Sequence, residues 1–296
     1  MSITCRVLSA SAEFIVILVI HSSFILDFCE VYILLQVIYR VKLSVDDEGR
    51  LDIFTSFPPD PVHRGSLQLR TGSVIGLPSN FYYQTVGDVG RNSILVGQEM
   101  VDWNSSAGKE LQNALVLSDK AKAFVIAREF FRAKSFTVHV DTLLQLCCLV
   151  FAYYSGAWLN YNMLLTMRLK PWARFIVFST IGVAGLSLYI MISDASHCWY
   201  DNRVDEAAAK LRKIYAEGGV EYYEKVLQRN CALRRLLGLK GAKQFTRYGN
   251  VVSLWRNRSV QLTSRHDNLV KYLAEYEHEE TVVQPDDDIN EEQTVS

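Results

Sequence analysis

The sequence predicts a mainly α-helical membrane protein, in which a transmembrane helical hairpin is flanked by an α-rich (α+β) soluble lobe. Two apolar runs, Leu143–Leu165 and Trp172–Ser193, are each about 22 residues long, and about 20 helical residues cross a hydrocarbon core of about 30 Å. A short break containing Arg168, Lys170 and Pro171 separates the two runs. The chain on both sides of this pair is polar or amphipathic, which predicts soluble structure on either flank.

Each apolar run is expected to be a helix, because lipid offers no hydrogen-bond partner for backbone N–H and C=O groups. The alternative is a pair of buried core helices in a soluble protein. Core helices rarely stay apolar on all faces over this length, which argues against that alternative. Arg174 is the only charged residue within either run, and it lies close to the start of the second, where its side chain can extend to the interface.

Small residues predict how the two spans pack on each other. Ala152 and Gly156 lie four residues apart in the first span, and Thr180 and Ala184 have the same spacing in the second. Small residues at this spacing let two helix backbones approach closely. Trp172 at the start of the second span is typical of an aromatic residue at a membrane interface.

Composition divides the 296 residues into a hairpin with two flanking regions. The predicted boundaries are a hydrophobic N-terminal segment (1–42), the two halves of the lobe (43–142 and 194–272), the hairpin (143–193) and an acidic, disordered tail (273–296). The formal net charge of −1 and the scattered Lys and Arg residues argue against nucleic-acid binding. The six cysteines form no C-x-x-C pair, which argues against a disulfide framework.

The N-terminal segment is open to more than one interpretation. Phe14–Ile20 and Val31–Tyr39 are apolar, but Asp27 and Glu30 would place carboxylates near mid-bilayer in a single long span, which is costly. A signal peptide would need a more basic start than Arg6, and a mitochondrial transit peptide would be rich in Arg and poor in acidic residues. An additional N-terminal membrane helix and a wrongly assigned start of the chain are the other interpretations.

Before the hairpin, the lobe is expected to begin with β structure and then to become helical. Val74–Gly76 and Ile94–Val96 are short apolar runs between turn residues, which is typical of strands. Ser105 or Ser106 is a candidate N-cap for one helix, and Ser118 is a candidate N-cap for a second. The second helix is expected to continue into the membrane, because no helix-breaking residue follows it. Its apolar stripe comprises Ala121, Phe124, Val125 and Arg128.

After the hairpin, Asp205–Glu217 is expected to be an amphipathic helix. Gly218 and Gly219 are expected to end it, because glycine adopts the left-handed backbone of a helix C-terminus without a Cβ clash. Two further helices are expected over 220–228 and after Asn230. Loops and short extended pieces, with a turn at Gly249–Asn250, are expected to follow.

The sequence contains no P-loop, no dinucleotide-binding glycine motif, no H-E-x-x-H and no G-x-S-x-G. Glu129 is a lone carboxylate that is expected to be solvated or salt-bridged. His197 and Cys198 are neighbours in the sequence, but adjacent residues alone do not make a copper or zinc site. We therefore predict a non-enzymatic protein without a cofactor or metal.

Two alternatives to a non-enzymatic scaffold stay open. A small membrane enzyme or carrier would need polar residues along a path, for which the first span offers Gln145, Asn160 and Asn162. A protein of the endoplasmic reticulum or cell surface would carry glycans at the sequons of Asn104 and Asn257.

Four stretches carry a family resemblance, and they occur in a fixed order around the hairpin. They are GSVIGLPSNF (72–81), VDWNSSAGKELQNALVLSDKAKAFVIAREF (101–130), IYAEGGVEYYEKVLQRNCALRRLLG (214–238) and YGNVV (248–252). Over roughly residues 65–255, the chain closely resembles the transmembrane protein 177 family of metazoan mitochondria. Residues 1–42 and the acidic tail depart from the family pattern.

The resemblance implies a multi-pass protein of the mitochondrial inner membrane that acts in the biogenesis of cytochrome c oxidase. Its expected partners are newly synthesised oxidase subunit 2, the assembly chaperone of that subunit and the copper metallochaperones. The resemblance carries over no catalytic residues. It points to Val101–Trp103 and Gly218–Lys225 as working surfaces, with the candidate partner-binding residues Asp102, Trp103, Gly218, Gly219, Glu221, Tyr222 and Tyr223. For Trp103, Tyr222 and Tyr223, ordinary core packing is the alternative.

The charges around the hairpin bear on its orientation. Positive charge favours the side of the membrane that is not translocated. Arg168, Lys170 and Arg174 would therefore place the connecting loop in the matrix and the lobe in the intermembrane space. Basic residues on the other flank, among them Arg128 and Arg132, favour the opposite orientation.

Overall fold

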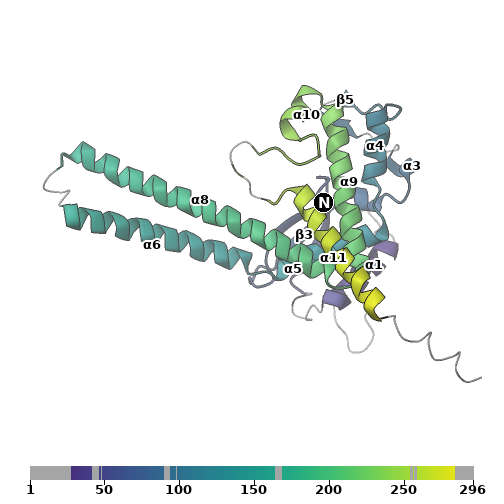
Figure 1. Cartoon of the computed structure of the whole chain (residues 1–296), viewed down its shortest axis with the longest axis horizontal. Helices are drawn as coiled ribbons and strands as arrows, with labels where there is room; N and C mark the ends of the chain where they lie inside the picture. The colour runs from purple at the N-terminus through teal and green to yellow at the C-terminus, as the bar shows by residue number, and fades with distance from the viewer. Residues whose placement is uncertain are drawn as a thin grey trace, which may run out of the picture. The chain divides into compact units, whose positions relative to one another are not determined.

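A computed structural model of the chain describes residues 28–41, 47, 49–89, 94–97, 99–163, 169–253, 256 and 259–283. The chain divides into two compact units (Figure 1). Unit 1 comprises Met1–Lys134, Asn202–Leu254 and Val260–Ser296, and unit 2 comprises Ser135–Asp201 and Trp255–Ser259. The described elements are mainly helices, with small sheets and a long apolar helical pair, which confirms the predicted fold class.

Helices form most of unit 1. The long helix α9 (Lys213–Leu236) packs against α4 (Ser106–Leu115), α5 (Asp119–Lys134) and α11 (Leu262–Val283). The side chains of Phe124, Phe130, Tyr223 and Leu269 are at most 1% exposed, and they fill the space between these helices. Because α5 precedes the hairpin and α9 follows it, both flanks of the hairpin build one core.

A three-stranded sheet completes unit 1, with the order β1 (Leu51–Ser56), β3 (Ser73–Pro78) and β2 (Val62–Gly65). Strands β1 and β3 are parallel, with Leu51 opposite Ser73, and β2 is antiparallel to β3, with Val62 opposite Gly76. The short strands β4 (Leu95–Val96) and β5 (Glu99–Met100) form a separate antiparallel pair. The strands predicted at Val74–Gly76 and Ile94–Val96 are confirmed. The short helices η1 (Ser79–Tyr82) and α3 (Val86–Val89) lie between the two sheets in the sequence.

Helix α1 (Phe28–Val41) shows how part of the hydrophobic N-terminal segment is used. Val37 is 0% exposed, and the helix packs against α5 in the core of unit 1. Residues 28–41 are therefore part of a folded core, and the structure does not use them as a third membrane helix. The apolar run Phe14–Ile20 lies outside the described residues.

The two helices predicted before the hairpin are confirmed, but their connection to the hairpin is not continuous. Ser105 caps α4 by accepting a hydrogen bond from the N–H of Gly108 at 3.0 Å. Helix α5 ends at Lys134 and does not run into the membrane span as expected. The carbonyl oxygen of Ala133 accepts hydrogen bonds from the N–H of Leu67 at 2.9 Å and from the hydroxyl of Ser66 at 3.1 Å. A distant segment therefore ends α5, although no helix-breaking residue is present.

The expectation that Gly218 and Gly219 end a helix is wrong, because α9 runs through both residues and on to Leu236. These glycines lie where α9 crosses α5. A Cβ on Gly218 would collide with the backbone carbonyl of Lys120, and a Cβ on Gly219 would lie 2.8 Å from the ring of Phe124. Their function is close helix contact rather than helix termination.

The C-terminal expectations are partly corrected. Gly249 has a φ of 83°, which confirms the predicted turn, and the short helix α10 (Leu239–Gln244) precedes it. Helix α11 occupies Leu262–Val283, where loops and the start of a disordered tail were expected. The reason is packing, since Leu269 is fully buried against α9. Residues 284–296 lie outside the described residues.

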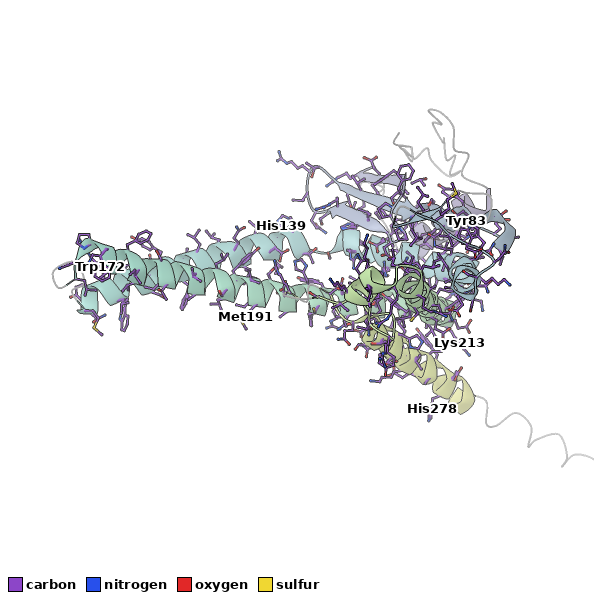
Figure 2. All side chains as sticks on the ribbon, turned by 90° about the horizontal axis from the view of Figure 1, so that it is seen from above. Tyr83, His139, Trp172, Met191, Lys213 and His278 are labelled. Atoms are coloured by element: carbon purple, nitrogen blue, oxygen red, sulfur yellow. The ribbon has the colours of Figure 1, made fainter. Side chains whose placement is uncertain are left out.

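Unit 2 is the hairpin. Among the described residues, two helices are long and apolar enough to span a membrane, α6 (Thr137–Met163) and α8 (Pro171–Ala209). They run side by side in Figures 1 and 2, with Trp172 beside the connecting loop and His139 at the other end of the pair. Only 11% and 6% of the two apolar windows are buried, which is far below the burial of core helices. Helix α8 continues beyond the predicted end at Ser193 as one uninterrupted helix.

Candidate functional site

The first predicted partner-binding segment, Val101–Trp103, forms a fixed turn before α4. The carbonyl oxygen of Asp102 accepts a hydrogen bond from the hydroxyl of Ser105 at 2.6 Å, and its carboxylate accepts one from the N–H of Asn104 at 3.0 Å. A Cβ on Gly108 would collide with the same carbonyl oxygen, so the turn requires glycine there. Asp102 is exposed and Trp103 is half-buried, so a partner can reach both side chains.

The second predicted segment, Gly218–Lys225, fixes α9 to its neighbours. The carboxylate of Glu221 accepts hydrogen bonds from the hydroxyl and the N–H of Ser118, at 2.5 and 3.2 Å, at the start of α5. Lys225 Nζ donates to the carbonyl oxygen of Asn113 at 2.8 Å. Tyr222 and Tyr223 are only 6% and 1% exposed. For the two tyrosines, the geometry is therefore that of core packing.

The two predicted segments do not form one surface. Trp103 packs in a small cluster with Leu233 and Leu236, near the end of α9. Gly218 and Gly219 lie at the other end of α9, against α5. The partner-binding role of both segments stays a prediction, for which Asp102 is exposed and Trp103 and Glu221 are half-buried.

Five side chains that are at most 7% exposed form what we call the buried ionic cluster: Arg128, Glu129, Asp205, Tyr223 and Arg265. The carboxylate of Asp205 accepts hydrogen bonds from Arg265 at 2.6 and 2.8 Å and from the hydroxyl of Tyr223 at 2.9 and 3.0 Å. Arg128 donates to that hydroxyl at 3.1 Å and to Glu129 Oε1 at 2.7 and 3.0 Å. The cluster therefore ties α5, α8, α9 and α11 together.

The electrostatics of the buried ionic cluster keep Tyr223 and Glu129 in their usual protonation states. Burial raises the pKa of the Tyr223 hydroxyl, with Arg265 opposing and Asp205 adding to the increase. Burial by itself would also raise the pKa of Glu129, but Arg128 and Arg132 outweigh it and hold this pKa below its ordinary value. Tyr223 is thus a neutral donor and Glu129 an anion. The charges are balanced and shielded from solvent, and the arrangement joins four helices of the fold.

Sequence reasoning found only part of the buried ionic cluster. The salt bridge expected for Glu129 is confirmed, whereas its solvation is not, because Glu129 is 0% exposed. The position of Arg128 on the apolar stripe of α5 was a signal of burial. Asp205 and Arg265 were missed, because their pairing joins helices that are distant in the sequence.

Within the hairpin, one helix packs as predicted and the other is rotated. Gly156 is buried, and a Cβ there would lie 3.5 Å from the ring of Phe178. Ala152 faces Gly185, whose Cβ would lie 2.9 Å from the Ala152 methyl group. The expected contact through Thr180 and Ala184 is not formed, since both residues are exposed. Spacing alone did not distinguish Ala184 from its neighbour Gly185.

Ion pairs mark the end of the hairpin opposite the connecting loop. His197 Nε2 lies 3.1 Å from Asp141 Oδ2, and Arg256 Nε donates to both carboxylate oxygens of Asp194 at 2.7 and 2.8 Å. In the part of the chain that the structure describes, no group of three or more His, Cys, Asp or Glu side chains is placed to hold a metal ion.

The polar residues considered for a carrier path differ in their surroundings. Asn162 Nδ2 donates to the carbonyl oxygen of Trp158 within α6 at 2.9 Å. Gln145 is exposed on the outside of the hairpin. The side-chain oxygen of Asn160 is buried without a hydrogen-bond partner among the described residues.

Comparison with known proteins supports the resemblance. The family model described as Transmembrane protein 177 matches residues 55–287, which extends further at both ends than the resemblance over 65–255. The chain is 35% identical to Transmembrane protein 177 of Homo sapiens over 224 residues, which covers 74% of this chain and 70% of the relative. It is 33% identical to Transmembrane protein 177 of Danio rerio over 240 residues, covering 78% and 75%.

A more distant match extends the comparison. The Caenorhabditis elegans protein named Uncharacterized protein R144.12 is 23% identical over 252 residues, covering 77% of this chain and 70% of the relative. No solved structure matched the chain. The long family match, the vertebrate identities and the apolar helical pair agree with one another, and the chain belongs to the transmembrane protein 177 family.

Proposed function

We propose that the protein is a non-enzymatic assembly factor of the mitochondrial inner membrane that stabilises newly synthesised subunit 2 of cytochrome c oxidase. The chain belongs to the transmembrane protein 177 family, and the role in oxidase biogenesis is the one that the family resemblance implies. Proposed partners are subunit 2, its assembly chaperone and the copper metallochaperones. The lipid bilayer surrounds the hairpin.

The observation that carries the scaffold role is the contrast between the two units. In unit 1, the chemically reactive side chains of the buried ionic cluster are sealed between helices. In unit 2, the hairpin exposes most of its apolar surface, with 11% and 6% of the two windows buried. A protein whose charged groups hold its own fold, while its membrane surface is free to contact other helices, is suited to hold a client rather than to transform one.

A pulse-labelling experiment tests this proposal. Mitochondrial translation products are labelled briefly, the membranes are solubilised gently, and the full-length protein is recovered through a C-terminal tag. We expect labelled oxidase subunit 2 to be enriched over the other mitochondrial products. A recovery without enrichment of any labelled product would contradict the proposal.

Point variants then map the contact on the lobe. Asp102→Ala and Trp103→Ala are suitable because both side chains are accessible. Asp267→Ala is a control, because its carboxylate is 71% exposed on α11 and the residue lies outside both predicted segments in the sequence. Tyr222 and Tyr223 are unsuitable for mapping, since their truncation would disturb the core.

A further inference from the structure

The hairpin carries an open groove along α6 with a volume of about 460 Å³. Tyr154 and Trp158 project into this region with two thirds of their surface exposed. One residue of α8 completes the groove, so it belongs entirely to unit 2. Its lining residues are Phe151, Tyr154, Ser155, Trp158, Leu159 and Ile181.

Two hydroxyl groups of this groove lie at the middle of the membrane span. At 1.5 Å per residue, Tyr154 and Ser155 are about 12–14 Å from Met163, where α6 ends beside the connecting loop. That distance is close to half of a hydrocarbon core of about 30 Å. Neither side chain is long enough to reach the aqueous interface from this depth.

Neither hydroxyl has a hydrogen-bond partner within the part of the chain that the structure describes. The ring of Tyr154 packs edge to face against the ring of Tyr153, with 5.5 Å between ring centroids. The hydroxyls of Tyr153 and Ser179 likewise have no partner among the described residues, whereas four other hairpin hydroxyls are satisfied within their own helices. Each of them donates to the carbonyl oxygen four residues earlier, at 2.8 or 2.9 Å: Thr142, Thr180, Ser187 and Ser196.

Lipid cannot complete this groove, because acyl chains offer no hydrogen-bond acceptor at mid-bilayer and an unsatisfied polar group there is costly. A transmembrane helix can do so, since polar side chains form hydrogen bonds between helices in membranes. A second copy of the chain fits less well, because a two-fold contact would set the groove against the same groove and leave both unfilled.

We infer that the groove receives one transmembrane helix of the client protein, and that a polar side chain at the middle of that helix accepts hydrogen bonds from Tyr154 and Ser155. This inference rests on the proposed function and names the surface that performs it. The neighbouring part of α8 allows close approach, because Thr180 and Ala184 are exposed and Ala184 lies one turn from Ile181.

Photo-crosslinking in intact mitochondria tests the inference. Trp158 and Phe175 are each replaced by p-benzoyl-phenylalanine in the full-length protein. The two sites are matched, because both are aromatic, 65% and 73% exposed, and near the connecting loop, but only Trp158 lines the groove. We expect a crosslink from position 158 to a labelled mitochondrial translation product, at several times the yield from position 175.

The outcomes separate the inference from the proposed function. Equal yields from both positions, adducts with lipid alone, or an adduct with a second tagged copy would overturn the inference, while co-purification of labelled subunit 2 would still support the assembly role. If the protein recovers no labelled product at all, the assembly role fails, and the inference fails with it.

Two variants that keep the shape of the groove test the hydrogen bonds. Tyr154→Phe and Ser155→Ala are each expected to lower recovery of the labelled client roughly threefold, the usual effect of one hydrogen bond between membrane helices. Ser187→Ala is the control, because its hydroxyl is already bonded to the carbonyl oxygen of Val183 at 2.9 Å. Equal steady-state amounts of all variants show that they fold. Unchanged recovery in the Tyr154→Phe, Ser155→Ala double variant would overturn the hydrogen-bonding part of the inference.

Discussion

Glu129 is fully buried, and its negative charge is balanced by Arg128 at 2.7 Å and by Arg132 at 3.5 Å. Removing one partner of a buried ion pair leaves the other charged without compensation. We therefore expect Glu129→Gln to lower the free energy of unfolding by about 3–5 kcal/mol. Thermal unfolding of the full-length protein in detergent measures the change. Glu110→Gln is the control, because its carboxylate is 45% exposed beside Arg235 and is expected to cost at most about 1 kcal/mol. A melting temperature that changes equally in both variants would contradict this account.

His63 gives the fold a dependence on pH. Burial lowers the pKa of its imidazole below the ordinary value, with Glu129 opposing this shift and Arg132 adding to it, and its Nε2 lies 3.0 Å from the hydroxyl of Ser73. As the pH falls, the unfolded chain binds a proton at this histidine before the folded protein does. The stability that the neutral ring provides is therefore complete above about pH 6.5 and is lost on acidification below that pH. We expect the melting temperature to fall between about pH 7 and pH 5.5, and to fall less in His63→Gln. An identical slope in the variant would show that other groups cause the dependence.

At the scale of elements, the crossing of α5 and α9 depends on the absence of two side chains. A Cβ on Gly219 would lie 2.8 Å from both Phe124 and Leu269, so Gly219→Ala is expected to lower the free energy of unfolding by about 1–3 kcal/mol. Gly218→Ala is expected to cost more, because its Cβ would meet the backbone of Lys120, which cannot rotate away. Gly182→Ala is the matched control, since no atom lies within 4 Å of its Cβ position. Urea or thermal unfolding of the three variants ranks them, and an equal effect at all three sites would contradict the crossing argument.

The same crossing shows what the sequence could and could not predict. The spans, the Ser105 cap and the central strand near Val74 were predictable, because hydrophobic patterns and capping residues act locally. Helix boundaries were less predictable where a distant segment decides them. Gly218 fits both a helix end and a helix crossing, and only the position of Lys120 distinguishes the two.

The candidate site shows the same limit. The chemical types in the buried ionic cluster are visible in the sequence, but the pairing of Asp205 with Arg265 depends on tertiary structure. The groove beside Tyr154 was not predicted, because it depends on which face of α6 meets α8. Ala152 and Gly156 identified that face on one helix, whereas two adjacent small residues, Ala184 and Gly185, left it undecided on the other.

At the scale of the whole molecule, the chain leaves unit 1 after Lys134 and returns to it at Asn202. The segments on either side of the hairpin share one core, in which α5 and α9 pack together. An even number of membrane crossings lies between them, so both flanks must lie on the same side of the membrane. The sequence predicted this arrangement from the hairpin alone, and the common core adds a physical constraint, since a core cannot form across a bilayer.

Labelling of single cysteines tests this topology. The native cysteines are replaced by alanine, and one cysteine is introduced at Met100 before the hairpin, at Leu239 after it, or at Lys170 in the connection. The side chains of Met100 and Leu239 are 77% and 87% exposed. The positive-inside tendency favours a matrix location for the basic connection. In that case, a membrane-impermeant maleimide added to mitoplasts will label Met100→Cys and Leu239→Cys. It will label Lys170→Cys only after the inner membrane is permeabilised. Labelling of Lys170→Cys alone would reverse the orientation and keep the hairpin. Labelling of only one of the two lobe positions would contradict the shared core, because that core requires both flanks on one side.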